Sequence, residues 1–552
     1  MFIRVLFCLI LVWRVVSWAL LSGMVLSRRW RKEFVIMAGP YVMGIDFGTE
    51  SVRVAIFTTA GEPVIFRTQS YKLNHPRPGW AEQSPDEWWD ALGRAVHQAL
   101  EDGRIPGSAI AGIGTDATSC TVLALDQQFR PLMPAILWMD LRAAEQSKRI
   151  AACGHPALKY NGYGAVSAEW FPCKALWLKE SRPEIYRAAA YLCECEDWLT
   201  YRLTGRYAAN VDTAALRCYH DRNVGGWQAD FFELIGLGDM LDKMPKEVLD
   251  MGELVGGLTP EAAEHLGLPV GIPVAAGGAD ALVAQIGLDV VAPGKMAFIT
   301  GSSHLMLGQS ATELHAKGMW GSYTDAVIPG QYTVEAGQAS SGSIMKWFKD
   351  HFCGTWAREA ETAGVSVYGI LNAQVAKIPP GSEGLIVLDH WQGNRSPYTD
   401  PESRGMMWGF SLRHTPAHVA RAIMEGVAYG SEQNLRLFRE NGYAVKEIVI
   451  CGGVVNSPVW MQIHADVSNV PIVLTKVSEA AALGAAMLGA VASGIYPSIA
   501  DAARSMVQTT GRVEPNAEAH ERYQFYLDSY LNTYPAMKDL LHGMVRHVAD
   551  QS

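Results

Sequence analysis

The chain has 552 residues, of which 49% are hydrophobic, and its formal net charge is −10 at neutral pH. A single hydrophobic core stops growing near ~250–300 residues, so this length predicts two large domains. The acidic balance argues against nucleic acid as the main partner, because such a partner requires a broad basic surface. The nine cysteines are scattered and form no C-x-x-C pair, which favours reduced thiols and a cytoplasmic protein.

Residues 1–39 form an apolar leader that fits two interpretations. Residues 1–26 are strongly apolar, and a basic run from Arg28 to Lys32 follows them, as in a membrane anchor. Alternatively the leader is a start-site artefact, and Met37 or Met43 is the true first residue. We favour the artefact, because the first predicted strand begins only after the leader.

The segment from Tyr41 onward predicts an α/β fold. Three apolar stretches separated by tight turns, YVMGID, VRVAIFT and VIFRTQSY, predict an antiparallel meander of three strands. A helix is predicted from Pro85 to Ala99, and it is followed by strands with the sequences IAGIGTDA and TVLALD and by a helix that begins near Arg142. Strands and helices continue to alternate as far as Gly287, which is typical of α/β proteins.

A similar pattern then begins again, which suggests a duplicated fold. The strand AFITGSSHLMLG is followed by EIVICGGVVNS and by a helix of small residues at Ala480–Ser493. We expect the boundary near residues 288–296, with domains at 40–290 and 291–505 and a helical tail at 506–552. No low-complexity linker separates the halves, which favours two close domains with a central cleft and a hinge.

Glycine turns at three predicted strand ends indicate a phosphate-binding site. Asp46 ends the first strand beside a glycine turn, and related turns occur at 300–303 and 452–453. An acid in this position can hold Mg²⁺ while N–H and hydroxyl groups bind phosphate oxygens. One such turn could reflect turn chemistry alone, but three are harder to explain in that way. The chain has no G-x-x-x-x-G-K-[ST] motif, so a P-loop is excluded.

Asp280 is the candidate general base. It follows Gly277 and Gly278 and precedes an apolar helical run. On the motif alone, the carboxylate could equally cap that helix or accept a proton. Its place between two phosphate-type turns favours the base.

Six stretches, in this order and spacing, resemble the FGGY family of carbohydrate kinases over residues 40–505. They read MGIDFGTESVRVAIF, GWAEQSPDEWW, ILWMDLRA, GGADALVAQIG, AFITGSS and CGGVVNSPVWMQIHADV, and EAAALGAAMLGA follows them. The resemblance implies two RNase H-like domains of the actin-like ATPase superfamily, with the sugar bound mainly by the first and ATP mainly by the second. It also implies Mg²⁺ as a cofactor, a small-molecule sugar and ATP as partners, and domain closure over both substrates. A homodimer is compatible with it.

The resemblance assigns site residues by position. It places Mg²⁺ on Asp46 and the general base at Asp280. Residues facing the nucleotide and its phosphates would be Thr49, Gly301, Ser302, Gly453 and Asn456. Trp138, Asp140 and Arg142 would support the wall of the sugar pocket.

Several segments resemble the ribulokinase subgroup. GIGTDATSC, VSAEWFPCKALWLKE and VEAGQASSG are ribulokinase-like, and GNRSPYTDP resembles the D-ribulose branch. Thr118, Ser119, Arg217 and Glu335 would then bind the ketose. Arg217 stands where ribulokinases carry a lysine, so xylulose, L-ribulose and tetritols stay open as substrates. From the residues alone, Glu335 could be a helix cap and Arg217 a surface cation.

The expected reaction is transfer of the γ-phosphoryl group of ATP to the terminal hydroxyl of a ketopentose such as ribulose. An alternative from another class is a non-catalytic actin-like ATPase switch. The ribulokinase-like segments and Asp280 argue against this alternative.

Overall fold

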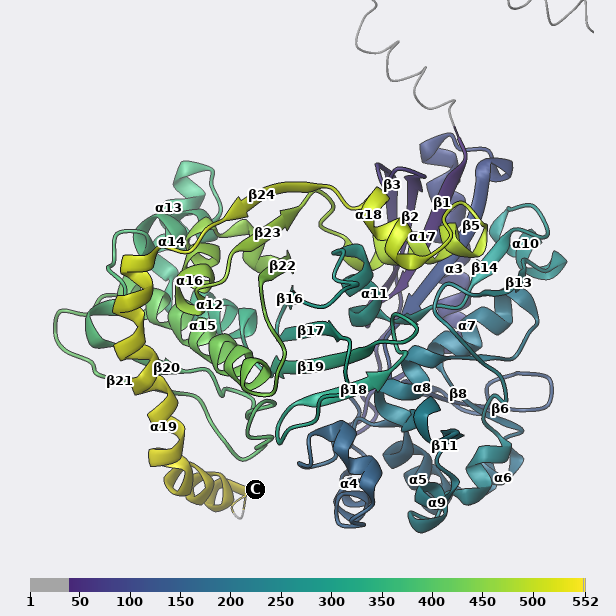
Figure 1. Cartoon of the computed structure of the whole chain (residues 1–552), viewed down its shortest axis with the longest axis horizontal. Coiled ribbons are helices and arrows are strands. Elements are labelled where there is room, and N and C mark those ends of the chain that lie inside the picture. The colour runs from purple at the N-terminus through teal and green to yellow at the C-terminus, as the bar shows by residue number, and fades with distance from the viewer. Residues whose placement is uncertain (1–38, 550, 552) are drawn as a thin grey trace, which may run out of the picture.

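The computed structural model describes residues 39–549 and 551, which form two α/β halves that each contain a seven-stranded sheet (Figure 1). Residues 1–38 of the apolar leader lie outside this described part, so neither interpretation of the leader is tested there. Among the described residues, no helix is both long and apolar enough to cross a membrane.

The first sheet has the strand order β13-β14-β5-β1-β2-β3, with β15 beside β5. The predicted meander is confirmed, since β1, β2 and β3 pair antiparallel while β5 lies parallel to β1. Every residue of β1 is buried, as expected for a strand covered on both faces. The strands are β1 (Tyr41–Phe47), β2 (Ser51–Thr58), β3 (Pro63–Ser70), β5 (Ile110–Ala117), β13 (Leu254–Gly257), β14 (Pro273–Ala275) and β15 (Gly278–Ala279).

The second sheet has the order β18-β19-β17-β16-β22-β23-β24. Its central part repeats the first, because β16 pairs antiparallel with β17 and parallel with β22. The strands are β16 (Lys295–Thr300), β17 (His304–Ser310), β18 (Trp320–Thr324), β19 (Tyr332–Gln338), β22 (Glu447–Gly452), β23 (Ile472–Thr475) and β24 (Thr509–Val513). The predicted tail is therefore not wholly helical: β24, rich in β-branched residues, pairs with β23, and α19 (Ala517–Ala549) follows it.

Smaller sheets and helices surround these two sheets. The predicted strand TVLALD forms β6 (Val122–Leu125), which joins β4 (Glu82–Gln83), β7 (Ala135–Ile136) and β8 (Tyr191–Glu194) instead of the main sheet. A separate pair consists of β20 (Ile386–Leu388) and β21 (Met406–Trp408). Helices used below are α3 (Pro85–Gly103), α8 (Val211–Cys218), α11 (Asp280–Gly287), α12 (Gly342–Phe352), α15 (Pro416–Glu440), α16 (Pro458–Ser468), α17 (Ala480–Ala492) and α18 (Ile499–Met506).

Helix α17 follows the strands of the second sheet in sequence but packs on the first sheet, where it contacts β1, β5 and α11 (Figure 1). Glycines allow this close approach. A Cβ at Gly44 would lie 2.0 Å from the carbonyl oxygen of Ala482, and one at Gly114 would lie 1.9 Å from that of Ala485. Likewise, a Cβ at Gly484 would lie 2.0 Å from the carbonyl oxygen of a residue in α11. We call these three glycines the glycine seam, where backbone packs directly on backbone.

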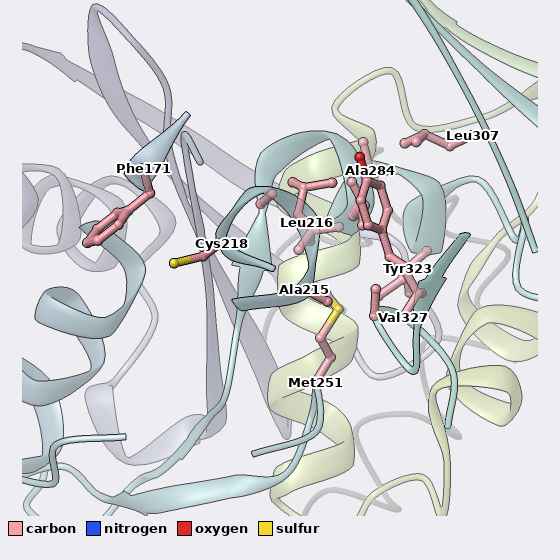
Figure 2. Packing of buried hydrophobic residues seen from close by; sticks show 14 of the residues in the cluster. Phe171, Ala215, Leu216, Cys218, Met251, Ala284, Leu307, Tyr323 and Val327 are labelled. Carbon is pink, nitrogen blue, oxygen red and sulfur yellow. The ribbon is translucent and has the colours of Figure 1, made fainter. Parts of the chain in front are cut away.

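One apolar cluster extends across both halves. It includes Leu216 of α8 and Ala284 of α11 together with Leu307 of β17 and Tyr323 of β18 (Figure 2). These side chains are almost fully buried, so the two halves share a close-packed core.

Candidate active site

Three acids meet at the carboxyl ends of neighbouring strands of the first sheet. The register pairs Asp46 of β1 with Asp116 of β5, and Asp116 with Gly278 of β15. Asp280 follows β15 directly and begins α11. The sequence motifs did not indicate Asp116, although it is the second-last residue of the predicted strand IAGIGTDA.

Burial and mutual repulsion give these acids unequal proton affinities. Burial, and then the nearby Asp46 carboxylate, raise the pKa of Asp116 well above its ordinary value, so Asp116 is the protonated member of the pair. Burial, followed by the charge of Asp46, raises the pKa of Asp280 to about 6. Burial also raises the pKa of Asp46, although Arg53 opposes this shift. Arg53 Nη1 lies 3.0 Å from Asp46 Oδ2 and 2.8 Å from Glu479 Oε2 of the second half.

Asp280 lines a cavity of about 250 Å³ whose wall comes from both halves of the chain. The structure brings seven predicted residues to this wall: Thr49, Thr118, Ser119, Trp138, Arg217, Asp280 and Gly301. It also adds Glu169 and Arg395, which lie in the ribulokinase-like segments but were not singled out. The volume is just below the ~300–1,000 Å³ of typical ligand pockets, so the cavity suits a small molecule.

Arg217 and Glu335 form a buried ion pair beside this cavity. Arg217 Nη2 lies 2.6 Å from Glu335 Oε1, and its Nη1 donates to Ser119 Oγ at 3.4 Å. Glu335 also accepts a hydrogen bond of 3.1 Å from Tyr323 Oη. It is fully buried in β19 and lies behind the wall. The helix-cap interpretation of Glu335 is therefore wrong, and so is the surface-cation interpretation of Arg217, because only 15% of its side chain is exposed.

Further hydrogen bonds hold the part of the cavity wall that contains Thr49, Cys120 and Trp138. Trp138 Nε1 donates to Thr49 Oγ1 at 3.0 Å. This hydrogen bond fixes the glycine turn that follows β1 at the wall of the cavity. The buried Lys174 Nζ donates to the carbonyl oxygens of Cys120 and Trp138 at 2.8 and 3.1 Å. Arg142 pairs with Asp140 at 2.7 Å behind this wall. The predicted supporting residues thus lie close to the pocket, and Lys174 joins them.

A second cavity of about 920 Å³ lies on the second half. Gly301 borders both cavities, whereas Ser302, Gly453 and Asn456 border only the second. Its further lining residues include Lys346, Trp347, Tyr368 and Asn372, which no motif indicated. Ser302 O accepts hydrogen bonds from Ser341 N and Ser343 Oγ at 2.9 and 2.8 Å. The loop therefore sits at the N-terminus of α12, where N–H groups favour phosphate.

The donor set fits a magnesium ion that arrives with a nucleotide. Among residues 39–549 and 551, no group of three or more His, Cys, Asp or Glu side chains could hold a metal ion by itself. Mg²⁺ is commonly bound by one or two carboxylates together with substrate phosphates and water. Asp46 would supply such a carboxylate. Apart from its chain neighbours, no atom lies within 4 Å of a Cβ built on Gly453, which leaves room for a ligand at that turn.

Comparisons with known proteins agree with this arrangement. The FGGY family of carbohydrate kinases matches through its N-terminal domain at residues 41–287 and its C-terminal domain at residues 296–493. An FGGY carbohydrate kinase domain-containing protein of Xenopus laevis is 34% identical over 535 residues, which cover 89% of this chain and 95% of that protein. A ribulokinase of Shouchella clausii is 33% identical over 528 residues, with 89% and 94% covered.

The crystal structure of xylulose kinase from Rhodospirillum rubrum superposes with a TM-score of 0.81 at 26% identity, and the match covers 91% of this chain and 100% of that chain. The predicted fold of two actin-like ATPase domains is thereby confirmed. The chain belongs to the FGGY family of carbohydrate kinases and is an ATP-dependent phosphotransferase.

Proposed function

We propose that this kinase phosphorylates the terminal hydroxyl of a ketopentose and that its substrate is D-ribulose, which it converts to D-ribulose 5-phosphate. One observation carries the proposal: Asp280, Arg217 and Ser119 line a small cavity that meets the nucleotide-type cavity at Gly301. The similarity to proteins named ribulokinase supports this choice of sugar.

In the proposed mechanism, the C5 hydroxyl oxygen attacks the γ-phosphorus of ATP in line with the bond to ADP. The new O–P bond forms as the bond to the leaving oxygen breaks, and Asp280 accepts the hydroxyl proton. Arg217 and Ser119 orient the sugar, and Trp138 keeps the Thr49 hydroxyl in place. A magnesium ion held by Asp46 and the phosphates would supply neutralisation of phosphate charge.

The pH dependence of turnover should report the ionisation of Asp280. Its pKa of about 6 lies above the ordinary value of 3.8, so the carboxylate is present above that pH and is lost as the pH falls through it. We expect kcat/KM for the ketose to fall about tenfold per pH unit below about pH 6. Phosphate groups also titrate near pH ~6, so MgATP affinity should be measured at each pH as a control. A flat profile at constant MgATP affinity would contradict the role of Asp280.

A coupled assay of ADP release tests the substrate. D-Ribulose, L-ribulose, D-xylulose and erythritol should each be supplied to the full chain with MgATP, and we expect D-ribulose to give the highest kcat/KM. Phosphorus NMR of the product should place the phosphate on C5. A higher kcat/KM for D-xylulose would overturn the sugar but keep the reaction. Nucleotide hydrolysis that no sugar stimulates would instead favour the ATPase switch.

A further inference from the structure

Arg395 brings a positive charge from the second half into the sugar cavity. It lies between β20 and β21 and lines the same cavity as Asp280 and Gly301. Its stem passes close to Gly337, where a Cβ would lie 3.3 Å from Arg395 Cδ. A side chain at position 337 would therefore press on the arginine.

Arg395 is not neutralised by a direct salt bridge within the described part of the chain, although the carboxylates of Glu169 and Asp280 line the same cavity. Within residues 39–549 and 551, its guanidinium forms no ion pair, and its contact is with the ring of Trp320, 5.6 Å from the ring centre. Arg217 lines the same cavity and lies 5.3 Å from the centre of the same ring, but it is paired with Glu335. The cavity thus contains one arginine that is already paired and one that is available to an anion.

The loop that carries Arg395 is fixed by hydrogen bonds within the loop and by hydrogen bonds to α19. Asn394 and Asp400 exchange two backbone hydrogen bonds of 2.8 Å, and Asn394 Oδ1 accepts one of 2.9 Å from the backbone of Tyr398. The Asp400 carboxylate is held by Tyr534 Oη at 2.5 Å and by His542 Nε2 at 2.7 Å, both from α19. Arg395 is therefore presented by a preorganised loop, as charge stabilisation in a transition state requires.

We propose that Arg395 is a catalytic residue that contacts the phosphoryl group as it moves from the nucleotide to the sugar and that remains bound to the phosphate of the product. This inference rests on the proposed function, in which a ketose is neutral and the transferred group is the anion that enters the cavity. Arginine binds phosphate oxygens through paired, charge-assisted hydrogen bonds. Its bonds to the phosphoryl group are hydrogen bonds only: the hydroxyl proton passes to Asp280, and ADP departs with the electrons of the broken bond.

The variants R395M and R395K test this proposal, with R404M as a matched control, because Arg404 is an exposed arginine on the same segment. Calorimetry without nucleotide should give the Kd of D-ribulose and of D-ribulose 5-phosphate for each protein. For R395M we expect kcat to fall about 10²–10³-fold and the Kd of the sugar phosphate to rise about tenfold or more, with the Kd of D-ribulose within about threefold. R395K should lie between R395M and wild type, and R404M should match wild type.

Other outcomes overturn the proposal. An equal loss of affinity for D-ribulose and its 5-phosphate would make Arg395 a sugar-binding residue, and unchanged kcat with unchanged product affinity would remove it from the reaction. Matching thermal melts and an unchanged Kd for ADP separate these results from misfolding. A wild-type protein that phosphorylates no ketose would overturn the proposed function itself, and this inference with it.

Discussion

Replacing Asp280 by asparagine is expected to lower ketose-dependent turnover by about 10²–10⁴, or roughly 3–5 kcal/mol of barrier. The exchange keeps the size and the hydrogen-bonding capacity of the side chain but removes the carboxylate that accepts the hydroxyl proton. Stability should be unchanged or higher. Because burial raises the pKa of Asp280 to about 6, ionisation of this carboxyl costs folding free energy at pH 7, and a neutral amide avoids that cost.

A helix cap would behave in the opposite way, because Asn caps a helix about as well as Asp. Asp501 provides a matched control, because it is also an acid in the first turn of a helix, α18. The variant D501N should leave turnover unchanged. Thermal melts, MgATP affinity and ribulose-dependent ADP release should be measured for both variants. Turnover of D280N within about threefold of wild type would exclude Asp280 as the base.

Replacing Arg217 by methionine is expected to damage both stability and sugar use. The free energy of unfolding should fall by about 3–5 kcal/mol, because Glu335 would keep a buried charge without its partner. The kcat/KM for the ketose should also fall, by an amount that corresponds to a loss of about 1.5–3 kcal/mol of transition-state stabilisation, because a charge-assisted hydrogen bond is lost. The affinity for ATP should barely change, because Arg217 lines the cavity that contains Asp280 and not the second cavity.

The double variant R217M/E335Q separates the two effects. Removing both charges should restore most of the stability, because no uncompensated carboxylate is left in the core. Sugar use should stay low, since the arginine is still absent. Urea unfolding together with kinetics for sugar and ATP would measure both. A loss of ATP affinity as large as the loss of sugar use in R217M would contradict the position given to Arg217.

Local pattern was enough to predict the strands and turns that carry the site. The meander beginning at Tyr41, the helix α3 and the acid turn at Asp46 follow from residue spacing within short segments. The motif around Asp280 fits a helix cap as well as a base, and only its place between two distant turns favours the base. Asp116 could not be assigned in this way, because its neighbours are set by the pairing of β5 with β1 and β15. Strand register is a long-range property that a single segment does not encode.

The positions of Glu335 and Arg395 also depend on contacts between segments that are far apart in the sequence. Glu335 reaches the site through Arg217, which is 118 residues away in sequence. Arg395 enters the cavity from an irregular segment whose shape is held by α19. The family resemblance pointed to the segments that contain both residues, but only the fold separates a wall residue from the residue behind it.

The glycine seam has a consequence for biosynthesis. The strands β1 and β5 leave the ribosome early, whereas α17, which covers them, begins only at Ala480. Until that helix is made, the nascent first half has an uncovered apolar face, the kind of surface that chaperones bind. Helix α17 belongs to the C-terminal domain of the family match but packs on the first sheet. Truncation before α17 would therefore leave the first half without the helix that completes its core.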